Sequence, residues 1–312
     1  MRPTSSWNIG ARSLELGPRT LVMGVVNVTP DSFSDGGRYL EPAAAVEHAL
    51  RLLEEGADIL DVGGESTRPG AAVAPSSGEP SSPRRRVPVS AEEELRRVLP
   101  VIQDIKGARP DCIISVDTYK AEVARAAVAA GAEIVNDVSA FRWDPAMAGT
   151  VAELGCGAVL MHMRSRPEEW RNLPPPEDVV ALVQHDLEEW ARAAMCSGVR
   201  RERIALDPGF GFGKNFEENY PLLARLEELH QLGFPLAVGT SRKSFIGRAL
   251  RRDGHDAPVG ERAFGTLASE TAAILKGAHI IRTHEVKACV DAARIADALL
   301  KAGNQESVVG SR

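Results

Sequence analysis

The sequence predicts a single (β/α)8 TIM barrel, and three observations support this prediction. Short apolar segments alternate with longer amphipathic segments along the chain, and this unit recurs eight times. A glycine such as Gly56, Gly131 or Gly277 stands before several of the apolar segments, and most of these segments end in a polar side chain. Buried strands that alternate with helices are typical of a parallel sheet, and eight of them in one domain favour a closed barrel.

The N-terminal part of the chain is expected to contain a cap, two strands and an insertion. Residues 1–20 are expected to form the cap, with a hairpin around Gly10 and Gly17. Strands are expected at 21–28 and 59–62, with a helix at 42–55 between them. Residues 74–89 are rich in Ser, Pro and Gly and contain an arginine run at 84–86, which indicates a flexible insertion more than a partner site.

The remaining elements complete the barrel domain, which is expected to span residues 21–302. Ser90 and Glu93 form a capping box for a helix that runs to about residue 105. Strands are expected at 113–116, 134–135, 158–161, 204–206, 236–238 and 279–281. Helices are expected at 120–130, 146–155, 177–195, 219–229, on either side of 253–258, and at 286–301. Residues 303–312 are expected to form a disordered tail.

A doubly wound sheet is the alternative architecture for alternating strands and helices. Its dinucleotide-binding form would require a G-x-G-x-x-G turn after the first strand. The chain has Asn27-Val-Thr-Pro-Asp at this point, so the barrel is favoured.

Composition limits the classes of partner. The chain has 312 residues, of which 44% are hydrophobic and 26% charged, and its net charge is −6. This balance argues against nucleic acid or an anionic membrane as a partner, and an anionic ligand would need a local group of cations. No apolar run approaches the roughly 18 residues of a membrane span. The four cysteines are far apart, which predicts buried, reduced thiols and a cytoplasmic protein.

Polar residues at the strand ends are the candidate functional residues, because the C-terminal strand ends of a barrel share one face. This set contains Asn27, Thr67, Arg68, Asp117, Asn136, His162, Asp207, Lys243, Arg282 and His284. For His162, which stands between two methionines, a structural role and a ligand contact both remain open. No Ser-His-Asp or Cys-His arrangement is visible, which argues against covalent catalysis.

The chemistry of this set divides into three parts. Arg68, Arg282 and His284, with Ser241 and the loop from Gly209 to Lys214, suit a phosphate group, and the hard oxygens of Asn27 and Asp35 suit Mg2+. Asp117, Asn136 and Asp207 suit a neutral heterocycle with several N–H groups, and Lys243 can donate to a ring carbonyl. Phe33 and Phe212 can form an apolar wall for an aromatic co-substrate.

Long motifs in fixed order resemble the dihydropteroate synthase family from about residue 21 to residue 300. They are Asn27-Val-Thr-Pro-Asp-Ser-Phe-Ser-Asp-Gly-Gly, Asp61-Val-Gly-Gly-Glu-Ser-Thr-Arg-Pro-Gly, Ser115-Val-Asp-Thr, Asn136-Asp137, Leu160-Met-His-Met, Leu206-Asp-Pro-Gly-Phe-Gly-Phe-Gly-Lys, Ser241-Arg-Lys-Ser and Ile281-Arg-Thr-His. The resemblance implies an Mg2+-dependent transferase that joins 6-hydroxymethyl-7,8-dihydropterin diphosphate to 4-aminobenzoate and releases diphosphate. It also implies a homodimer that sulfonamides inhibit.

The same resemblance implies a role for each matching residue. The catalytic residues are expected to be Asp35, Asp117, Lys243, Arg282 and His284. The pterin site is expected to contain Asp117, Asn136, Met161, Asp207, Phe212, Gly239 and Lys243, and the diphosphate site Thr67, Ser241, Arg282 and His284. The 4-aminobenzoate pocket, where sulfonamides compete, is expected to contain Phe33, Arg68, Pro69, Phe212 and Ser241, and Asn27 is the expected metal ligand.

Two other functions fit part of this pattern. A pterin-dependent methyltransferase domain would share the barrel and the Asp/Asn pterin site, but it has no need for the Ser241-Arg-Lys or Ser66-Thr-Arg-Pro-Gly segments. A non-catalytic pterin-binding paralogue would differ by the loss of motif residues, and no such loss is visible.

Overall fold

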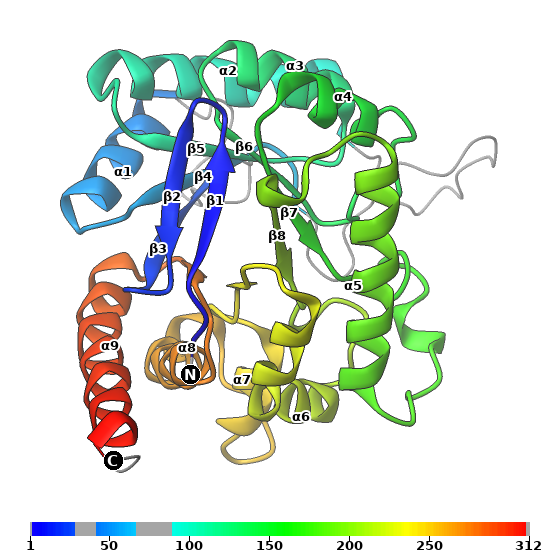
Figure 1. Cartoon of the computed structure of the whole chain (residues 1–312). Coiled ribbons are helices and arrows are strands. Elements are labelled where there is room, and N and C mark those ends of the chain that lie inside the picture. Colours follow the sequence, from blue (N-terminus) through cyan, green and yellow to red (C-terminus); the bar gives the residue numbers. More distant parts are fainter. Residues whose placement is uncertain (1, 29–41, 67–88, 310–312) are drawn as a thin grey trace.

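Eight parallel strands surrounded by helices form a barrel in the computed structural model (Figure 1). The structure describes residues 2–28, 42–66 and 89–309, without the side chains of Arg171 and residues 304–309. The barrel strands are β3 (Leu21–Asn27), β4 (Ile59–Gly63), β5 (Ile113–Asp117), β6 (Ile134–Asp137), β7 (Gly157–Met161), β8 (Ile204–Asp207), β9 (Ala237–Val238) and β10 (Ile280–Thr283). The predicted fold class is therefore confirmed.

The order of the strands shows how the barrel closes. The hydrogen-bonded order is β8-β7-β6-β5-β4-β3-β10-β9. A parallel bridge between Leu206 and Leu236 joins the two ends, and the Leu206 amide donates to the Pro235 carbonyl at 2.8 Å. The strand ends predicted to be polar therefore lie around one rim.

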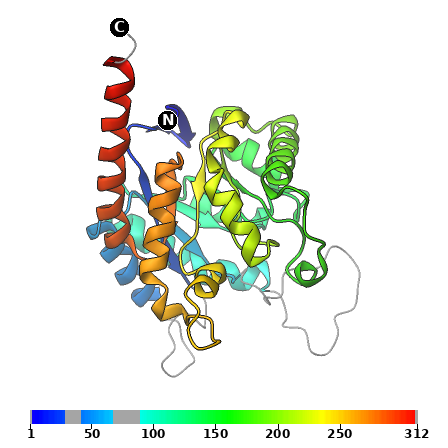
Figure 2. The same ribbon diagram turned by 90° about the horizontal axis from the view of Figure 1, so that it is seen from below.

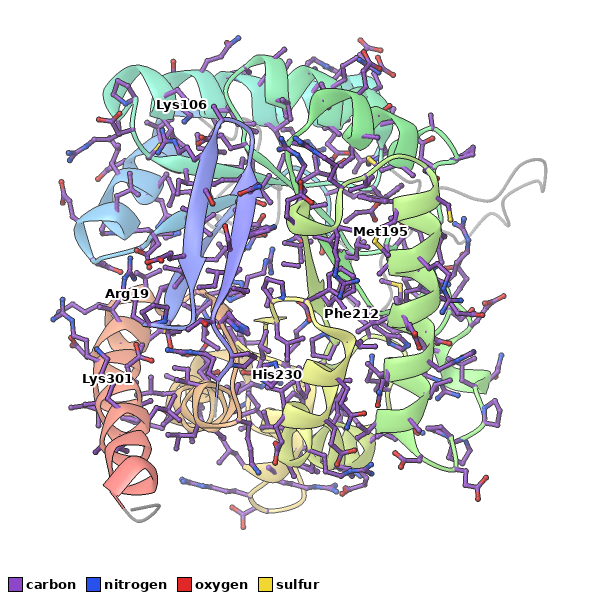
Figure 3. All side chains as sticks on the ribbon, in the orientation of Figure 1. Arg19, Lys106, Met195, Phe212, His230 and Lys301 are labelled. Carbon is purple, nitrogen blue, oxygen red and sulfur yellow. The ribbon has the colours of Figure 1, made fainter. Side chains whose placement is uncertain are left out.

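The helices lie outside the strands and cover them. They are α1 (Pro42–Glu54), α2 (Ala91–Ala108), α3 (Ala121–Ala129), α4 (Met147–Leu154), α5 (Val179–Cys196), α6 (Asn219–Ala224), α7 (Ser244–Ala249), α8 (Ala263–Leu275) and α9 (Val286–Val309). Short 3-10 helices lie at Trp170–Asn172, Arg201–Arg203, Phe216–Glu218, Leu226–Leu232 and Val259–Glu261. Charged side chains such as Lys301 lie on the outer surface (Figure 3). No helix within the described ranges has the length and apolar character that a membrane span needs.

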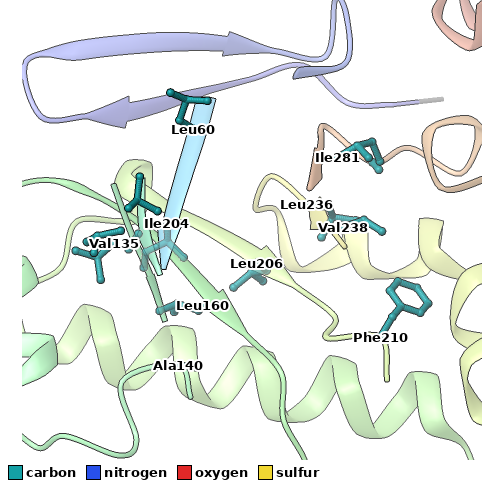
Figure 4. Close-up of a cluster of buried hydrophobic side chains, with 14 of the residues drawn as sticks. Leu60, Val135, Ala140, Leu160, Ile204, Leu206, Phe210, Leu236, Val238 and Ile281 are labelled. Atoms are coloured by element: carbon teal, nitrogen blue, oxygen red, sulfur yellow. The ribbon is translucent and has the colours of Figure 1, made fainter. Parts of the chain in front are cut away.

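Side chains on each strand alternate between two apolar layers. Outward residues such as Val135, Leu160 and Leu206 pack in the layer shared with the helices (Figure 4). Inward residues such as Ile59 and Val159 form a second layer near the N-terminal end of the barrel. This alternation is the two-residue period of a strand, so each strand contributes to both layers.

A hairpin closes the N-terminal end of the barrel. It consists of β1 (Ser5–Ile9) and β2 (Arg12–Leu16), and Figure 1 shows it across the barrel strands. Trp7, Ile9 and Leu16 are fully buried against the inner apolar layer, and the Trp7 indole donates to the Arg203 carbonyl at 2.8 Å. The predicted cap thus seals one end and leaves the opposite rim for the site.

The structure differs from the sequence prediction in three places. The helix expected at 219–229 ends at Ala224, and a 3-10 helix over Leu226–Leu232 follows it. α9 continues to Val309, so residues 303–309 are helical where a disordered tail was expected. All four cysteines are free thiols as expected, but of the four only Cys156 and Cys289 are buried: Cys112 is half-buried, and Cys196 is exposed in the last turn of α5. The proposed insertion at 74–89 lies outside the described residues except for Val89.

Candidate active site

A cavity of about 240 Å3 lies at the C-terminal ends of the barrel strands. With the exception of His162, the strand-end residues that were predicted to form the site and that the structure describes contribute to its wall. The predicted residues in the wall are Asn27, Asp117, Asn136, Met161, Asp207, Phe212, Gly239, Ser241, Lys243, Arg282 and His284. Phe33, Asp35, Thr67, Arg68 and Pro69 lie outside the described residues. The sequence prediction of one shared rim is confirmed for the residues in the wall.

Strand alternation explains why polar groups face the cavity. On several strands an apolar residue of the inner layer is followed, two positions later, by a polar residue that also points inward. Asp61 comes two positions after Ile59, and Arg282 two positions after Ile280. The register places Asp117 beside Asn136 and Met161 beside Asp207. Residues that are far apart in the sequence therefore become neighbours through sheet pairing.

An ion-pair network connects several strands at the base of the cavity. Arg282 donates through Nε to Asp61 Oδ2 at 2.6 Å and through a terminal nitrogen to Asp117 Oδ2 at 2.8 Å. The Asn136 amide also donates to Asp61 Oδ2, at 3.1 Å. Burial raises the pKa of the Asp117 carboxyl to about 7, although the Arg282 charge opposes this shift. Asp61 thus orients both the cation and the amide of the predicted site.

Asp207 presents its carboxylate from the end of β8. The Gly209 amide donates to Asp207 Oδ1 at 2.7 Å, and burial raises the pKa of this carboxyl. Gly209 has a φ of +65°, and a Cβ there would lie 1.8 Å from the His162 carbonyl oxygen. Glycine is required at this turn because any side chain would collide with the neighbouring strand end.

Lys243 and Phe212 face each other across one wall. The Lys243 ammonium lies 3.8 Å from the centre of the Phe212 ring, which also packs edge-on against Trp170. Figure 3 labels Phe212. This contact places a cation beside an apolar surface, an arrangement that suits a flat polar ring lying on Phe212.

Ser241 and His284 lie on the side of the rim that also carries the cations Arg242 and Arg262. Ser241 Oγ accepts from the His284 amide at 3.1 Å and lies 3.0 Å from His284 Nδ1. Arg242 has a φ of +59° and donates through Nε to Glu285 at 3.0 Å, while Arg262 donates to the Arg242 carbonyl at 2.9 Å. Such a left-handed conformation is uncommon for a non-glycine residue and is held here by its partners.

Glu65 lies at the rim and is held by a buried lysine. Lys120 forms ion pairs with Glu65 and, at 2.5 Å, with Glu94, and Glu65 also accepts from the Val89 amide at 3.3 Å. Burial opposes the charge of Lys120, but Glu94 and Glu65 together raise its pKa above the ordinary value. The network therefore fixes the chain on both sides of residues 67–88.

The structure also shows which residues sequence reasoning missed or misplaced. Asp61, Glu65 and Arg262 were not predicted as site residues, although Glu65 and Arg262 line the cavity and Asp61 supports it. The inward position of Asp61, two residues after Ile59, was a signal that could have identified it. His162 belongs to the predicted set but does not line the cavity. Its neighbour Lys214, expected among the phosphate donors, is also buried away from the cavity.

The fold and the site together define a barrel enzyme that holds a flat, N–H-rich heterocycle close to a group of cations, and comparisons with known proteins agree. The family model for pterin-binding enzymes matches residues 23–284. Dihydropteroate synthase of Escherichia coli K12 is 46% identical over 282 residues, which cover 90% of this chain and 92% of that protein.

Solved structures give the same result. The structure of Xanthomonas albilineans dihydropteroate synthase with 4-aminobenzoic acid has a TM-score of 0.82 and 44% identity, and covers 96% of this chain and 99% of that one. The Yersinia pestis dihydropteroate synthase with a sulfonamide drug has a TM-score of 0.83 and 38% identity, with 95% and 99% coverage. The chain belongs to the pterin-binding enzyme family, among the dihydropteroate synthases.

Proposed function

We propose that the chain condenses 6-hydroxymethyl-7,8-dihydropterin diphosphate with 4-aminobenzoate to give 7,8-dihydropteroate and diphosphate. The observation that supports this most strongly is the shared cavity, where the acceptors Asp117, Asn136 and Asp207 lie together with the cations Lys243 and Arg282. A carboxylate can accept two parallel N–H groups, so Asp207 suits the 2-amino and N3–H edge of the pterin. Lys243 donates to the ring oxygen.

The proposed mechanism is electrostatic. The bond between the pterin methylene carbon and the diphosphate oxygen breaks, and its electron pair remains on diphosphate. The Asp117 carboxylate stabilises the resulting methylene cation, and Lys243, Arg282 and His284 stabilise the leaving diphosphate. The amine of 4-aminobenzoate then attacks the methylene carbon and loses a proton to solvent. No covalent enzyme intermediate is needed.

Mg2+ is proposed as the cofactor, with Asn27 as its ligand from the described part of the chain. Asn27 lines the cavity, and its amide oxygen is a suitable hard donor. The described residues contain no group of three His, Cys, Asp or Glu side chains that would hold a metal alone. This donor set fits Mg2+, which is commonly bound by one or two protein oxygens together with substrate phosphates. When bound, the ion would neutralise negative charge on diphosphate. Asn27→Ala should increase the Mg2+ concentration needed for substrate binding in a calorimetric titration.

The 4-aminobenzoate pocket is proposed to adjoin Phe212 and Ser241, with Phe33, Arg68 and Pro69 contributing from the segments that are not described. Phe212 and Ser241 both line the cavity next to the proposed pterin site. The relatives solved with 4-aminobenzoic acid and with a sulfonamide drug support the proposal that this chain binds both kinds of molecule. A sulfonamide should therefore compete with 4-aminobenzoate and leave pterin binding intact.

The test of the function is whether diphosphate release requires both substrates. Release should occur with the pterin diphosphate and 4-aminobenzoate together and be slow when either is omitted. A pterin-binding paralogue would release none, and a pterin-dependent methyltransferase would bind a methylated folate without any requirement for diphosphate. Either result would contradict the proposal.

A cytoplasmic homodimer is also proposed. Large apolar side chains are exposed on α8 and α9, two helices that lie side by side in Figures 1 and 2: Phe264 is 87% exposed, Ile295 67% and Leu299 57%. We infer that these side chains belong to a surface that is covered in an assembly, as exposed apolar surface on neighbouring helices can be. Replacing Phe264 and Ile295 by Glu should shift the sedimentation coefficient from dimer to monomer, and an unchanged coefficient would contradict this interface.

A further inference from the structure

We propose that Lys214 and His162 form a positioning pair that holds the loop at residues 209–212 in place for pterin binding, through a hydrogen bond to Nδ1 of His162. The inference rests on the proposed function, because that function assigns this loop to the pterin site. It gives a task to two motif residues that do not line the cavity. Both are fully or almost fully buried: His162 is 0% exposed and Lys214 8%.

The contacts of the Lys214 ammonium define its task. Its Nζ lies 2.8 Å from the Gly209 carbonyl, 3.3 Å from the Phe212 carbonyl and 2.8 Å from His162 Nδ1. The His162 carbonyl is a fourth and longer contact, at 3.5 Å, so the three donors of the ammonium group serve the three nearer acceptors. Lys214 therefore ties both ends of the loop to the end of β7.

When Lys214 carries its proton it can only donate, and this fixes the tautomer of His162. Burial lowers the pKa of Lys214 to about 7, although the Asp207 charge opposes this shift. Since Lys214 donates to Nδ1, the ring proton lies on Nε2, which is 3.1 Å from Asp186 Oδ2. Burial and the Lys214 charge lower the pKa of His162 to about 3, so the ring remains neutral. The ring also stacks on Trp190, with centres 5.1 Å apart. His162 is thus held from three sides and offers a fixed acceptor to Lys214.

The loop that this pair holds forms one side of the proposed pterin site. Gly209, Phe210, Gly211 and Phe212 line the cavity, and the Gly209 amide orients the Asp207 carboxylate. If the acceptor at Nδ1 is lost, a buried cation loses one of its two 2.8 Å contacts, and only the longer contact of 3.5 Å to the His162 carbonyl still links the loop to the end of β7. The effect should appear in pterin affinity, because in the proposed function the pterin ring contacts Asp207 and Phe212.

A pair of matched variants distinguishes the role of His162 Nδ1 from that of Nε2. In His162→Asn the side-chain oxygen can take the place of Nδ1, whereas in His162→Gln the amide reaches the place of Nε2. Both variants lose the stacking on Trp190 and differ in the nitrogen they replace. Calorimetry with an unreactive oxidised pterin measures the affinity. We expect His162→Gln to weaken binding by about tenfold or more and His162→Asn by less than about threefold.

Two further variants complete the test. Lys214→Met should match His162→Gln in its loss of pterin affinity, and KM for the pterin diphosphate should rise more than kcat falls. Asp186→Asn keeps an acceptor for Nε2–H and should leave affinity within about threefold of the wild type. Thermal unfolding establishes whether each variant is folded. If Lys214→Met does not fold, the comparison of His162→Asn with His162→Gln tests the inference.

The outcomes separate this inference from the proposed function. Equal losses in His162→Asn and His162→Gln, or a larger loss in His162→Asn, would overturn the role of Nδ1. A wild-type protein that binds no pterin would instead overturn the proposed function.

Discussion

At the scale of single residues, Asp61 shows how one side chain supports two neighbours. Its Oδ2 accepts from both Arg282 and Asn136, and the side chain is fully buried. Arg282 donates at the same time to Asp117, so the cation is shared between two carboxylates. Groups that face the substrate are therefore oriented before it binds, which is the usual requirement for electrostatic catalysis.

Asp117→Asn should reduce turnover far more than pterin affinity. The amide keeps the size of the side chain but lacks the negative charge that stabilises the methylene cation. We expect kcat to fall by about 100-fold and the dissociation constant for a pterin to change by less than about threefold. Steady-state kinetics and calorimetry measure the two, with Asp104→Asn on the exposed face of α2 as the control. A loss confined to affinity would disprove the cation-stabilising role.

The pH dependence of kcat/KM should report the ionisation of the same carboxylate, Asp117. Burial raises the pKa of Asp117 to about 7, and the mechanism requires its ionised form. The value of kcat/KM should therefore fall as the pH decreases below about 7 and level off above it. The acid limb should be absent in Asp117→Asn, and a limb that persists in that variant belongs to another group.

At the scale of elements, the barrel separates stability from function. The hairpin β1–β2 seals the N-terminal end with apolar side chains, while the strand ends and loops at the opposite end carry the polar groups. In (β/α)8 barrels the N-terminal face contributes stability and the C-terminal face contributes chemistry. A change in the hairpin should therefore affect unfolding without changing the site.

Trp7→Ala tests this separation. Trp7 is fully buried and donates to the Arg203 carbonyl. Its loss should lower the free energy of unfolding by about 3–5 kcal/mol, as expected for a large cavity in a core. Urea unfolding measures this loss, and Leu14→Ala, on the partly buried side of the hairpin, should cost less. Pterin affinity should be unchanged in the folded variant, and a large drop in affinity would show that the two ends are coupled.

At the scale of the whole molecule, a buried carboxyl in α8 makes stability depend on pH. Glu270 is fully buried beside Thr283 and Cys289, and burial raises its pKa from 4.5 to about 7. A carboxyl with a raised pKa in the folded state binds its proton more tightly there than in the unfolded chain. Its contribution to stability is complete below pH 4.5 and is lost as the pH rises through about 7.

Glu270→Gln should remove the loss of stability that the wild type shows as the pH rises. The variant should be more stable than the wild type at pH 8, by at most about 3 kcal/mol, and the difference should shrink toward pH 5. Urea unfolding at the two pH values measures the difference, with the exposed Glu261→Gln as the control. A difference of equal size at pH 5 and pH 8 would mean that titration of Glu270 is not its cause.

The sequence by itself determined the fold class, the positions of the eight strands and most members of the described site. Strand and helix periods, with the polar residues that end the strands, are local signals, so the residue pattern alone identifies Asp117, Asn136, Asp207 and Arg282. Helix ends were harder to predict. The pattern at 219–229 does not show the break after Ala224, and Gly303 indicated a helix end that α9 passes on its way to Val309.

The tertiary structure alone decided which neighbours each site residue has. Barrel closure brings Arg282 next to both Asp61 and Asp117, although 221 and 165 residues separate them from it along the chain. It also brings His162 and Lys214 together behind the cavity. Such pairs depend on strand register and barrel curvature, because hydrogen bonds join groups by their positions in space and sequence spacing does not encode those positions.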